Sequence, residues 1–258
     1  MTNQLPSITP KQQEVLKLLY RYRFLNRIHI QTLLNHKDKR RIISWLKDLR
    51  DRQYVDWHYD RTDFIAKSQP GIYYLSLNGI RYLRSLNEYP NEELRKRYKE
   101  PTRTKAFINH CLLMADCCVA LEAKSSDELQ YVSVLPSDYT YPDSEYYFLN
   151  EIKPQLFFSK QQGNQTTSYL LESFELTLPR YQFRKRIKDY INFMNEWNDT
   201  NGPKPIVLFL CATTADLLYV KRRMKELIKE EDVDLNVRVT TLDRIKASGL
   251  ASMIWEEV

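Results

Sequence analysis

The chain has 258 residues, 43% of them hydrophobic and only 5 of them Gly, which suffices for one large or two ordinary folded domains and excludes collagen-like and low-complexity chains. Its net charge of +6 is uneven, because residues 1–100 carry 20 Lys and Arg against 11 Asp and Glu (+9), while residues 101–258 carry 19 against 22 (−3). A basic first half favours a polyanionic partner, with nucleic acid ahead of a membrane surface.

Membrane, metal and cofactor signals are missing from the sequence. No apolar run approaches the roughly 18 residues of a membrane span, and the opening MTNQLPSITPKQQ lacks a secretion-signal pattern, so we expect a cytoplasmic protein without a membrane partner. The four cysteines form no CxxC pair and are expected to be reduced thiols. The histidines have no metal-ligand spacing with them, and phosphate-loop and dinucleotide motifs are absent. No metal and no cofactor is predicted.

Helical signals begin at the stretch TPKQ, residues 9–12. It supplies a capping threonine, a proline suited to the first helical position and a glutamine that completes a capping box. Apolar residues at helical spacing follow as far as Phe24. A second helix fits residues 26–35 and a third fits residues 39–52, with Asp38 as its cap. The second helix is expected to bury Ile28, Ile30, Leu33 and Leu34.

The third predicted helix has two distinct faces. Its apolar residues recur at spacings of three and four, which predicts a buried stripe of Ile42, Ile43, Leu46 and Leu49. The opposite face is polar, and its basic members gather at the N-terminal end, with which a recognition helix enters the major groove of DNA. We therefore predict DNA contacts for Lys39, Arg40, Arg41, Ser44 and Lys47.

After the third helix the hydrophobic period becomes alternating. The stretches YVDWHYD (54–60) and IYYLS (72–76) predict two strands around a polar loop, and a helix at 77–86 follows. Arg61 and Lys67 lie in the loop, where they are expected to contact phosphate. Three helices, a hairpin and a fourth helix form a winged helix-turn-helix. Since winged helices also dock proteins, DNA binding and protein docking are both open for residues 1–87.

Residues 88–102 are polar and charged, with a proline near each end. This composition predicts a linker between two domains. Its basic residues are expected either to extend a phosphate track or simply to be solvated.

Residues 103–258 predict a second domain that mixes helices and strands. Helical spacing covers 103–124, 180–198, 214–230 and 241–247. Strand patterns cover 130–135, 154–159, 168–177, 206–211 and 235–241. The core order αβββαβαβ is that of the restriction-endonuclease-like fold. The predicted fold class is therefore α+β, a winged helix-turn-helix followed by a nuclease-like α/β domain.

At this point the chain resembles the replication-relaxation family of plasmids and other mobile elements. The first domain carries the resemblance in ITPKQQEVLKLLYRYRFL, RRIISWLKDLRDRQYV and IYYLSLNGIRYL. The second carries it in NHCLLMADCCVAL, which includes His110, and in FELT followed by RKRIKDY. The resemblance implies a winged helix joined to a PD-(D/E)xK nuclease-like domain, and a role in replication, relaxation or mobilisation of such elements.

The family pattern implies Pro-Asp at the start of one strand and Glu-x-Asp in the next. This chain has Pro154-Gln155 and Glu175-Leu176-Thr177, so both Asp positions are neutral. A hard cation such as Mg²⁺ prefers carboxylate oxygens, and one acid is a poor metal site. Gln155, Glu175 and Lys185 are therefore predicted as remnants of a lost catalytic site, and the chain is predicted not to be an enzyme.

Three interpretations of function remain open. The first is a double-stranded DNA-binding protein that recruits a relaxase or replication protein, with a possible homodimer. The second is a metal-dependent nuclease that uses Glu175. The third is a winged-helix interaction adaptor or transcriptional regulator.

Overall fold

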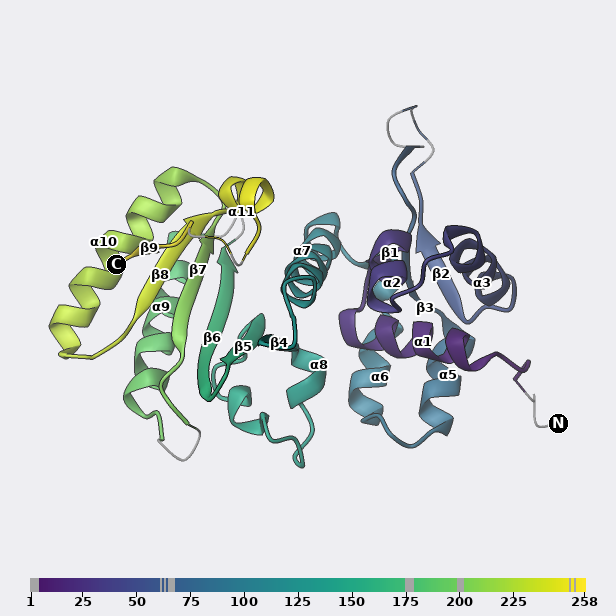
Figure 1. The fold of residues 1–258 in the computed structure, drawn as a ribbon, viewed down its shortest axis with the longest axis horizontal. Helices are drawn as coiled ribbons and strands as arrows, with labels where there is room; N and C mark the ends of the chain where they lie inside the picture. The colour runs from purple at the N-terminus through teal and green to yellow at the C-terminus, as the bar shows by residue number, and fades with distance from the viewer. Residues whose placement is uncertain are drawn as a thin grey trace. The chain divides into compact units, whose positions relative to one another are not determined.

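The computed structural model describes residues 5–60, 62, 64, 68–174, 179–198, 202–250, 252 and 254–258. It mixes helices and strands in two compact units, Met1–Val119 and Ala120–Val258 (Figure 1). The α+β class expected from the sequence is present. Within the described residues, no helix is long and apolar enough to cross a membrane.

Three helices open the first unit in the expected order, α1 (Pro10–Tyr22), α2 (Arg27–Leu33) and α3 (Lys39–Asp51). The predicted capping box of α1 is confirmed, because the Thr9 side chain accepts from the Gln12 backbone N–H and the Gln12 side chain accepts from that of Thr9. Asp38 caps α3 by accepting from the backbone N–H groups of Arg40 and Arg41. These caps fix where α1 and α3 begin.

Two apolar residues expected in the core are exposed instead. The exposed fractions are 52% for Ile28 and 47% for Ile43. Since one residue turns a helix by about 100°, the buried stripe of Ile42, Leu46 and Leu49 leaves Ile43 beside it, next to the polar face. The buried stripe of α3 is therefore narrower than the one that the sequence predicts.

A three-stranded antiparallel sheet completes the core of the first unit. It contains β1 (Leu25–Asn26), β2 (Val55–His58) and β3 (Ile72–Leu75) in the order β1-β3-β2. Strands β2 and β3 form the expected hairpin, which Figure 1 shows running away from the following helix, α5 (Leu77–Ser85). β1 was not expected, because a two-residue strand has no periodicity to detect.

Residues 88–102 are not the solvated linker that their composition predicts. They form α6 (Asn91–Arg97) and a 3₁₀ turn η1 (Glu100–Thr102), both within the first unit. Glu100 is fully buried and accepts hydrogen bonds from the side chain of Arg23 at 2.8 and 3.0 Å. The division between units falls later, inside α7 (Lys105–Glu122). The buried ion pair of Glu100 with Arg23 thus helps to hold this charged segment within the first unit.

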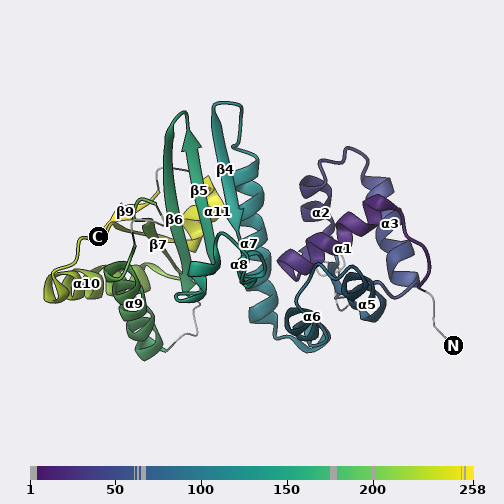
Figure 2. The same ribbon diagram turned by 90° about the horizontal axis from the view of Figure 1, so that it is seen from below.

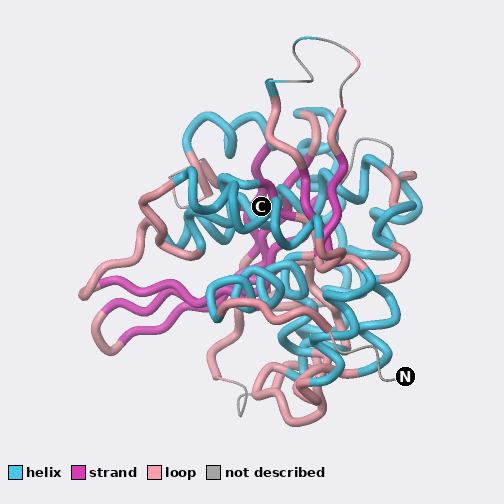
Figure 3. The backbone as a smooth tube through the Cα atoms, turned by 90° about the vertical axis from the view of Figure 1, so that its right-hand side faces the viewer, coloured by secondary structure: helices cyan, strands magenta, loops and turns pink. Residues whose placement is uncertain are grey.

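A six-stranded sheet organises the second unit, in the order β4-β5-β6-β7-β8-β9. The first three strands are antiparallel, β6, β7 and β8 are parallel, and β9 returns antiparallel. Figures 2 and 3 show β4, β5 and β6 side by side as long neighbouring strands. The strands are β4 (Leu129–Val134), β5 (Leu156–Gln162), β6 (Gln165–Phe174), β7 (Ile206–Cys211), β8 (Val237–Thr241) and β9 (Glu256–Glu257).

Helices α9 (Arg180–Asn195) and α10 (Thr214–Glu231) bury one face of this sheet. Phe157, Leu170 and Phe209 from the strands pack with Ile187 and Met224 from the helices. The predicted alternation of strands and helices is present from α7 to α11 (Leu242–Ser248). The short elements α8 (Pro136–Tyr139), η2 (Tyr147–Asn150) and β9 were not expected.

Candidate nucleic-acid interface and the polar cluster on the sheet

The basic N-terminal half of α3 has cations without carboxylate partners. Among the described residues, no Asp or Glu forms an ion pair with Lys39, Arg40, Arg41 or Lys47, and all four are exposed. The Asp38 carboxylate accepts from backbone N–H groups of this end and not from its guanidinium groups. At the other end of the helix, the C-cap residue Arg52 does pair with Asp48, at 2.9 Å. Free positive charge is therefore concentrated where a recognition helix would meet DNA.

Ser44 is exposed, as predicted, but it also borders the N-terminal segment. With Thr9, Gln12 and Trp45 it lines a cavity of about 440 Å³. The exposed Ile43 lies nearer to the cations, one turn from both Lys39 and Lys47. The polar face of α3 is thus basic with one apolar side chain in it.

The hairpin is joined to α3 through a cation–aromatic contact. The guanidinium of Arg50 lies 4.3 Å from the centre of the Trp57 ring. Trp57 stacks on Tyr59 with ring centres 4.8 Å apart and an interplanar angle of 15°, and contacts Tyr73 on the paired strand at 5.6 Å. We call this area the α3–hairpin surface, made of Lys39, Arg40, Arg41, Ile43, Lys47, Arg50, Trp57, Tyr59 and Tyr73.

Gly71 allows Trp57 to lie flat against the hairpin. A Cβ atom at this position would lie 2.4 Å from Cε3 of the Trp57 ring. Burial raises the pKa of Tyr73, with Arg50 and Arg27 opposing, so its hydroxyl stays neutral near pH 7 and can donate a hydrogen bond. Arg61 and Lys67, predicted to contact phosphate, lie outside the described residues.

The second unit places a buried carboxylate beside Gln155. The register of β5 and β6 brings Gln155 next to Glu172. Glu175, predicted as a remnant of the site, lies outside the described residues. The Gln155 amide donates to Glu172 Oε1 at 3.3 Å and to the Ser173 carbonyl at 3.1 Å, and its oxygen accepts from the Ser173 N–H at 2.7 Å. Gln155 therefore ties β5 to β6.

The other carboxylate oxygen of Glu172 is also occupied. Arg186 and Tyr190, one turn apart on α9, each donate to Oε2 at 2.9 Å. Arg186 also donates to the carbonyls of Ile152 at 2.6 Å and Lys153 at 2.9 Å. This polar cluster of Gln155, Glu172, Arg186 and Tyr190 was missed in the sequence, where the only signal is the spacing of an arginine and a tyrosine by four on the predicted helix.

The chemistry of the polar cluster is that of a satisfied structural network. Burial raises the pKa of Glu172, and the hydrogen bonds from Arg186 and Tyr190 oppose that shift. Both carboxylate oxygens already accept hydrogen bonds, and Arg186 holds the place near the acid that a cation would need. Lys185 is exposed and outside the cluster. Within the described part of the chain, no three His, Cys, Asp or Glu side chains gather as metal ligands.

Comparison with known proteins gives one family. The replication-relaxation family model matches residues 16–207. No curated protein matches the chain. Restriction endonuclease FokI aligns over 95% of this chain with 13% identity and a TM-score of 0.31. Its DNA-bound structure aligns over 93% with 12% identity and a TM-score of 0.26. The alignments cover 47% and 45% of those chains, so this chain spans about half their length.

Proposed function

The chain belongs to the replication-relaxation family, and from that premise we propose that it binds double-stranded DNA of a plasmid or other mobile element without cutting it. The first unit acts as a winged helix-turn-helix that holds a site on the duplex in the cytoplasm. The second unit acts as a nuclease-like fold that has lost its catalytic residues and presents the bound DNA to a relaxase or replication protein.

The observation that carries DNA binding is the set of four exposed cations on α3 without carboxylate partners in the described chain. Lys39, Arg40, Arg41 and Lys47 lie within nine residues of one helix, with the hairpin joined alongside through Arg50. Cations of this kind neutralise phosphates or, for arginine, donate two hydrogen bonds to guanine in the major groove. Phe64, 87% exposed on the hairpin, adds an apolar side chain to the same unit.

The proposal that the chain does not cut DNA is supported by the polar cluster. Glu172 is the carboxylate that lies beside Gln155, and both of its oxygens already accept hydrogen bonds from side chains. If Glu172 turned away to bind a metal, Arg186 would lose its counter-ion. A carboxylate held in this way stabilises the fold and does not serve to bind a metal that activates water.

Fluorescence anisotropy with a labelled duplex across a salt series tests DNA binding. Arg40→Ala with Arg41→Ala is expected to weaken binding by roughly 1–3 kcal/mol for each arginine that reads a base. For phosphate contacts alone, all sequences weaken alike and the salt slope falls by about one per residue. Arg222→Ala with Lys225→Ala on α10 is the matched control, since both side chains are exposed. Equal binding by both double variants would reject the α3 assignment.

Nicking of supercoiled plasmid with Mg²⁺ or Mn²⁺, followed in the same samples, tests the absence of catalysis. The expected result is retention of plasmid without nicking. Metal-dependent nicking that Glu175→Ala abolishes would establish a nuclease instead. Loss of both retention and nicking would favour a protein-docking adaptor.

A further inference from the structure

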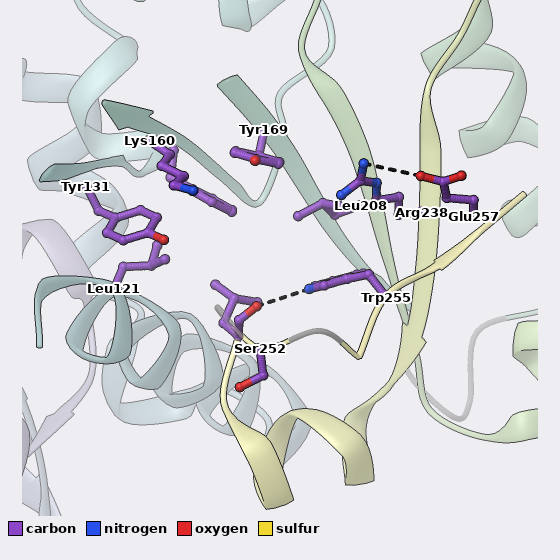
Figure 4. Close-up of a pocket in the computed structure, with 11 residues that line it drawn as sticks. Leu121, Tyr131, Lys160, Tyr169, Leu208, Arg238, Ser252, Trp255 and Glu257 are labelled. Carbon is purple, nitrogen blue, oxygen red and sulfur yellow. Dashed lines mark hydrogen bonds and ion pairs between the residues drawn. The ribbon is translucent and has the colours of Figure 1, made fainter. Parts of the chain in front are cut away.

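A cavity of about 470 Å³ opens on the sheet face opposite α9 and α10 (Figure 4). Successive side chains along a strand point to opposite faces of the sheet. Phe158, Tyr169 and Leu208 therefore line the cavity, while their strand neighbours Phe157, Leu170 and Phe209 pack under α9 and α10. The register pairs Tyr131 with Lys160 and Phe158 with Tyr169, and places Arg238 two strands farther along. Figure 4 shows Tyr131, Lys160, Tyr169, Arg238 and Trp255 around this space. No part of the proposed duplex-binding function uses it.

Flat aromatic surfaces line the cavity. Phe158 and Tyr169 stack with ring centres 4.7 Å apart and an interplanar angle of 14°, so Tyr169 is supported from beneath by a buried ring. The Trp255 indole is fixed by a hydrogen bond from its Nε1 to the Leu250 carbonyl at 3.0 Å. Tyr131 and Tyr169 are partly exposed, and burial raises the pKa of both. The Tyr169 and Trp255 rings are thus held in place, and a planar ligand can stack on them.

Two cations in the cavity have unused hydrogen-bonding capacity. Lys160 is partly buried, and no described residue accepts a hydrogen bond from it or pairs with its charge. Arg238 pairs with Glu257 at 3.3 Å, but its Nε is buried and has no partner among the described residues. Glu257 is 75% exposed and is the one acid among the described residues of the lining, so its pairing is weak and exchangeable. The cations therefore suit an anionic ligand.

The separation of the two cations indicates the size of that ligand. Lys160 on β5 and Arg238 on β8 are three strands apart and offset by four residues along the sheet, which places their backbones about 20 Å apart. A chain of phosphates with planar groups between them spans this distance, because Tyr169 on β6 lies between the two strands that carry the cations, and Tyr131 on β4 lies on the far side of Lys160.

We propose that this cavity binds an unpaired segment of single-stranded DNA, with bases stacked on Tyr131, Tyr169 and Trp255 and phosphates on Lys160 and Arg238. Aromatic platforms combined with nearby cations are the general means of holding single strands without reading sequence. This site is separate from the α3–hairpin surface, which is assigned to duplex DNA. The protein would thus hold duplex and unpaired DNA with different units.

Anisotropy of a labelled dT octamer tests the proposal in full-length protein that carries Arg40→Ala and Arg41→Ala, to reduce binding at α3. In that background Tyr169→Leu is expected to weaken binding about 5- to 100-fold, as for loss of one stacked base. Lys160→Ala is expected to weaken it several-fold and to reduce the salt slope by about 0.7, while Lys160→Arg retains binding. The control Lys225→Ala lies on α10 and should bind like its parent.

Competition experiments distinguish a DNA strand from a mononucleotide as the ligand of this cavity. An unlabelled dT octamer is expected to displace the probe at a concentration far below that of dTMP, whereas equal displacement would overturn a strand-binding site in favour of a mononucleotide site. Unchanged binding in both Lys160→Ala and Tyr169→Leu, with normal circular dichroism, would overturn the proposal. Loss of duplex binding in Arg40→Ala and Arg41→Ala concerns only the α3–hairpin surface, so the two proposals fail separately.

Discussion

Arg50 on α3 lies with its guanidinium 4.3 Å from the centre of the Trp57 ring on β2. This contact connects the basic helix to the aromatic side of the hairpin. A cation over a tryptophan contributes about 0.5–1 kcal/mol at an exposed site, and it also restricts where the hairpin can lie. The contact adds to the backbone hydrogen bond from Tyr54 to the Leu49 carbonyl, which also joins the start of the hairpin to α3.

Trp57→Leu is expected to weaken duplex binding by roughly 2- to 5-fold, because it removes the cation–aromatic contact that helps to hold the hairpin against α3. Anisotropy with a labelled duplex measures the change. Tyr98→Leu is the control, since Arg84 lies 5.9 Å from that ring in the same unit but outside the α3–hairpin surface. An equal loss in both variants would show that general stability, not the hairpin, is responsible.

Gly71→Ala is expected to destabilise the first unit by about 1–3 kcal/mol, because the new Cβ would overlap the Trp57 ring. Urea unfolding of Gly71→Ala, Trp57→Ala and the double variant measures the coupling between the two positions. Since Trp57→Ala removes the ring that the methyl group meets, the double variant should cost at least about 1 kcal/mol less than the sum of the single ones. Strict additivity would contradict the contact.

Arg186→Met is expected to destabilise the protein by about 3–5 kcal/mol, because it leaves the buried Glu172 carboxylate without its counter-ion. Glu172→Gln keeps an acceptor and removes the charge, so it should cost less. Without Arg186, burial is the main influence on the Glu172 carboxyl. Burial raises its pKa, so the folded pKa lies above the unfolded value.

The sign of the pH dependence follows from that shift. The folded Arg186→Met variant binds more protons at Glu172 than its unfolded chain does, so its stability rises as the pH falls toward the unfolded pKa. Urea unfolding at pH 5 and pH 8, each compared with the parent protein, measures this. A cost that is larger at pH 5 would contradict the assignment.

Glu100→Gln is expected to cost about 3 kcal/mol, because Arg97, 3% exposed, loses its nearby carboxylate at 3.9 Å and Arg23 loses a charged acceptor. Glu88→Gln is the matched control, since the ion pair of Glu88 with Lys17 is exposed and should contribute less than about 1 kcal/mol. Equal effects in urea unfolding would mean that residues 88–102 are a solvated linker after all.

The cysteine thiols are expected to react slowly with a disulfide reagent in the folded protein. All four are free and buried, and burial raises the pKa of Cys111 and Cys211 to about 12. Compared with a free thiol of pKa about 8.5, the reactive thiolate is roughly 10³-fold scarcer near pH 7.5. Reaction of four thiols only after addition of guanidinium is the expected result, and rapid reaction before it would contradict their burial.

Sequence periodicity located most of the fold, because long helices and apolar strands carry strong local signals. The order of the longer helices and strands from 103 to 248 and the capping box at Thr9 needed no tertiary information, whereas the short α8 and η2 carry no such signal. The partner of Gln155 did need it. Glu172 and Glu175 are equally acidic in sequence, and only the register of β5 with β6 brings Glu172 into reach. In the same way, Glu100 belongs to a buried ion-pair network that no local composition reveals.

The six-stranded sheet ends at β9, which is only two residues long and consists of Glu256 and Glu257. A long exposed edge strand offers unpaired backbone groups to any other extended chain, and short charged edges resist such pairing. Lys221 and Arg244 hold the Glu256 carboxylate in place. The parallel strands are therefore shielded on this side from the edge-to-edge aggregation to which their apolar sequences would otherwise expose them.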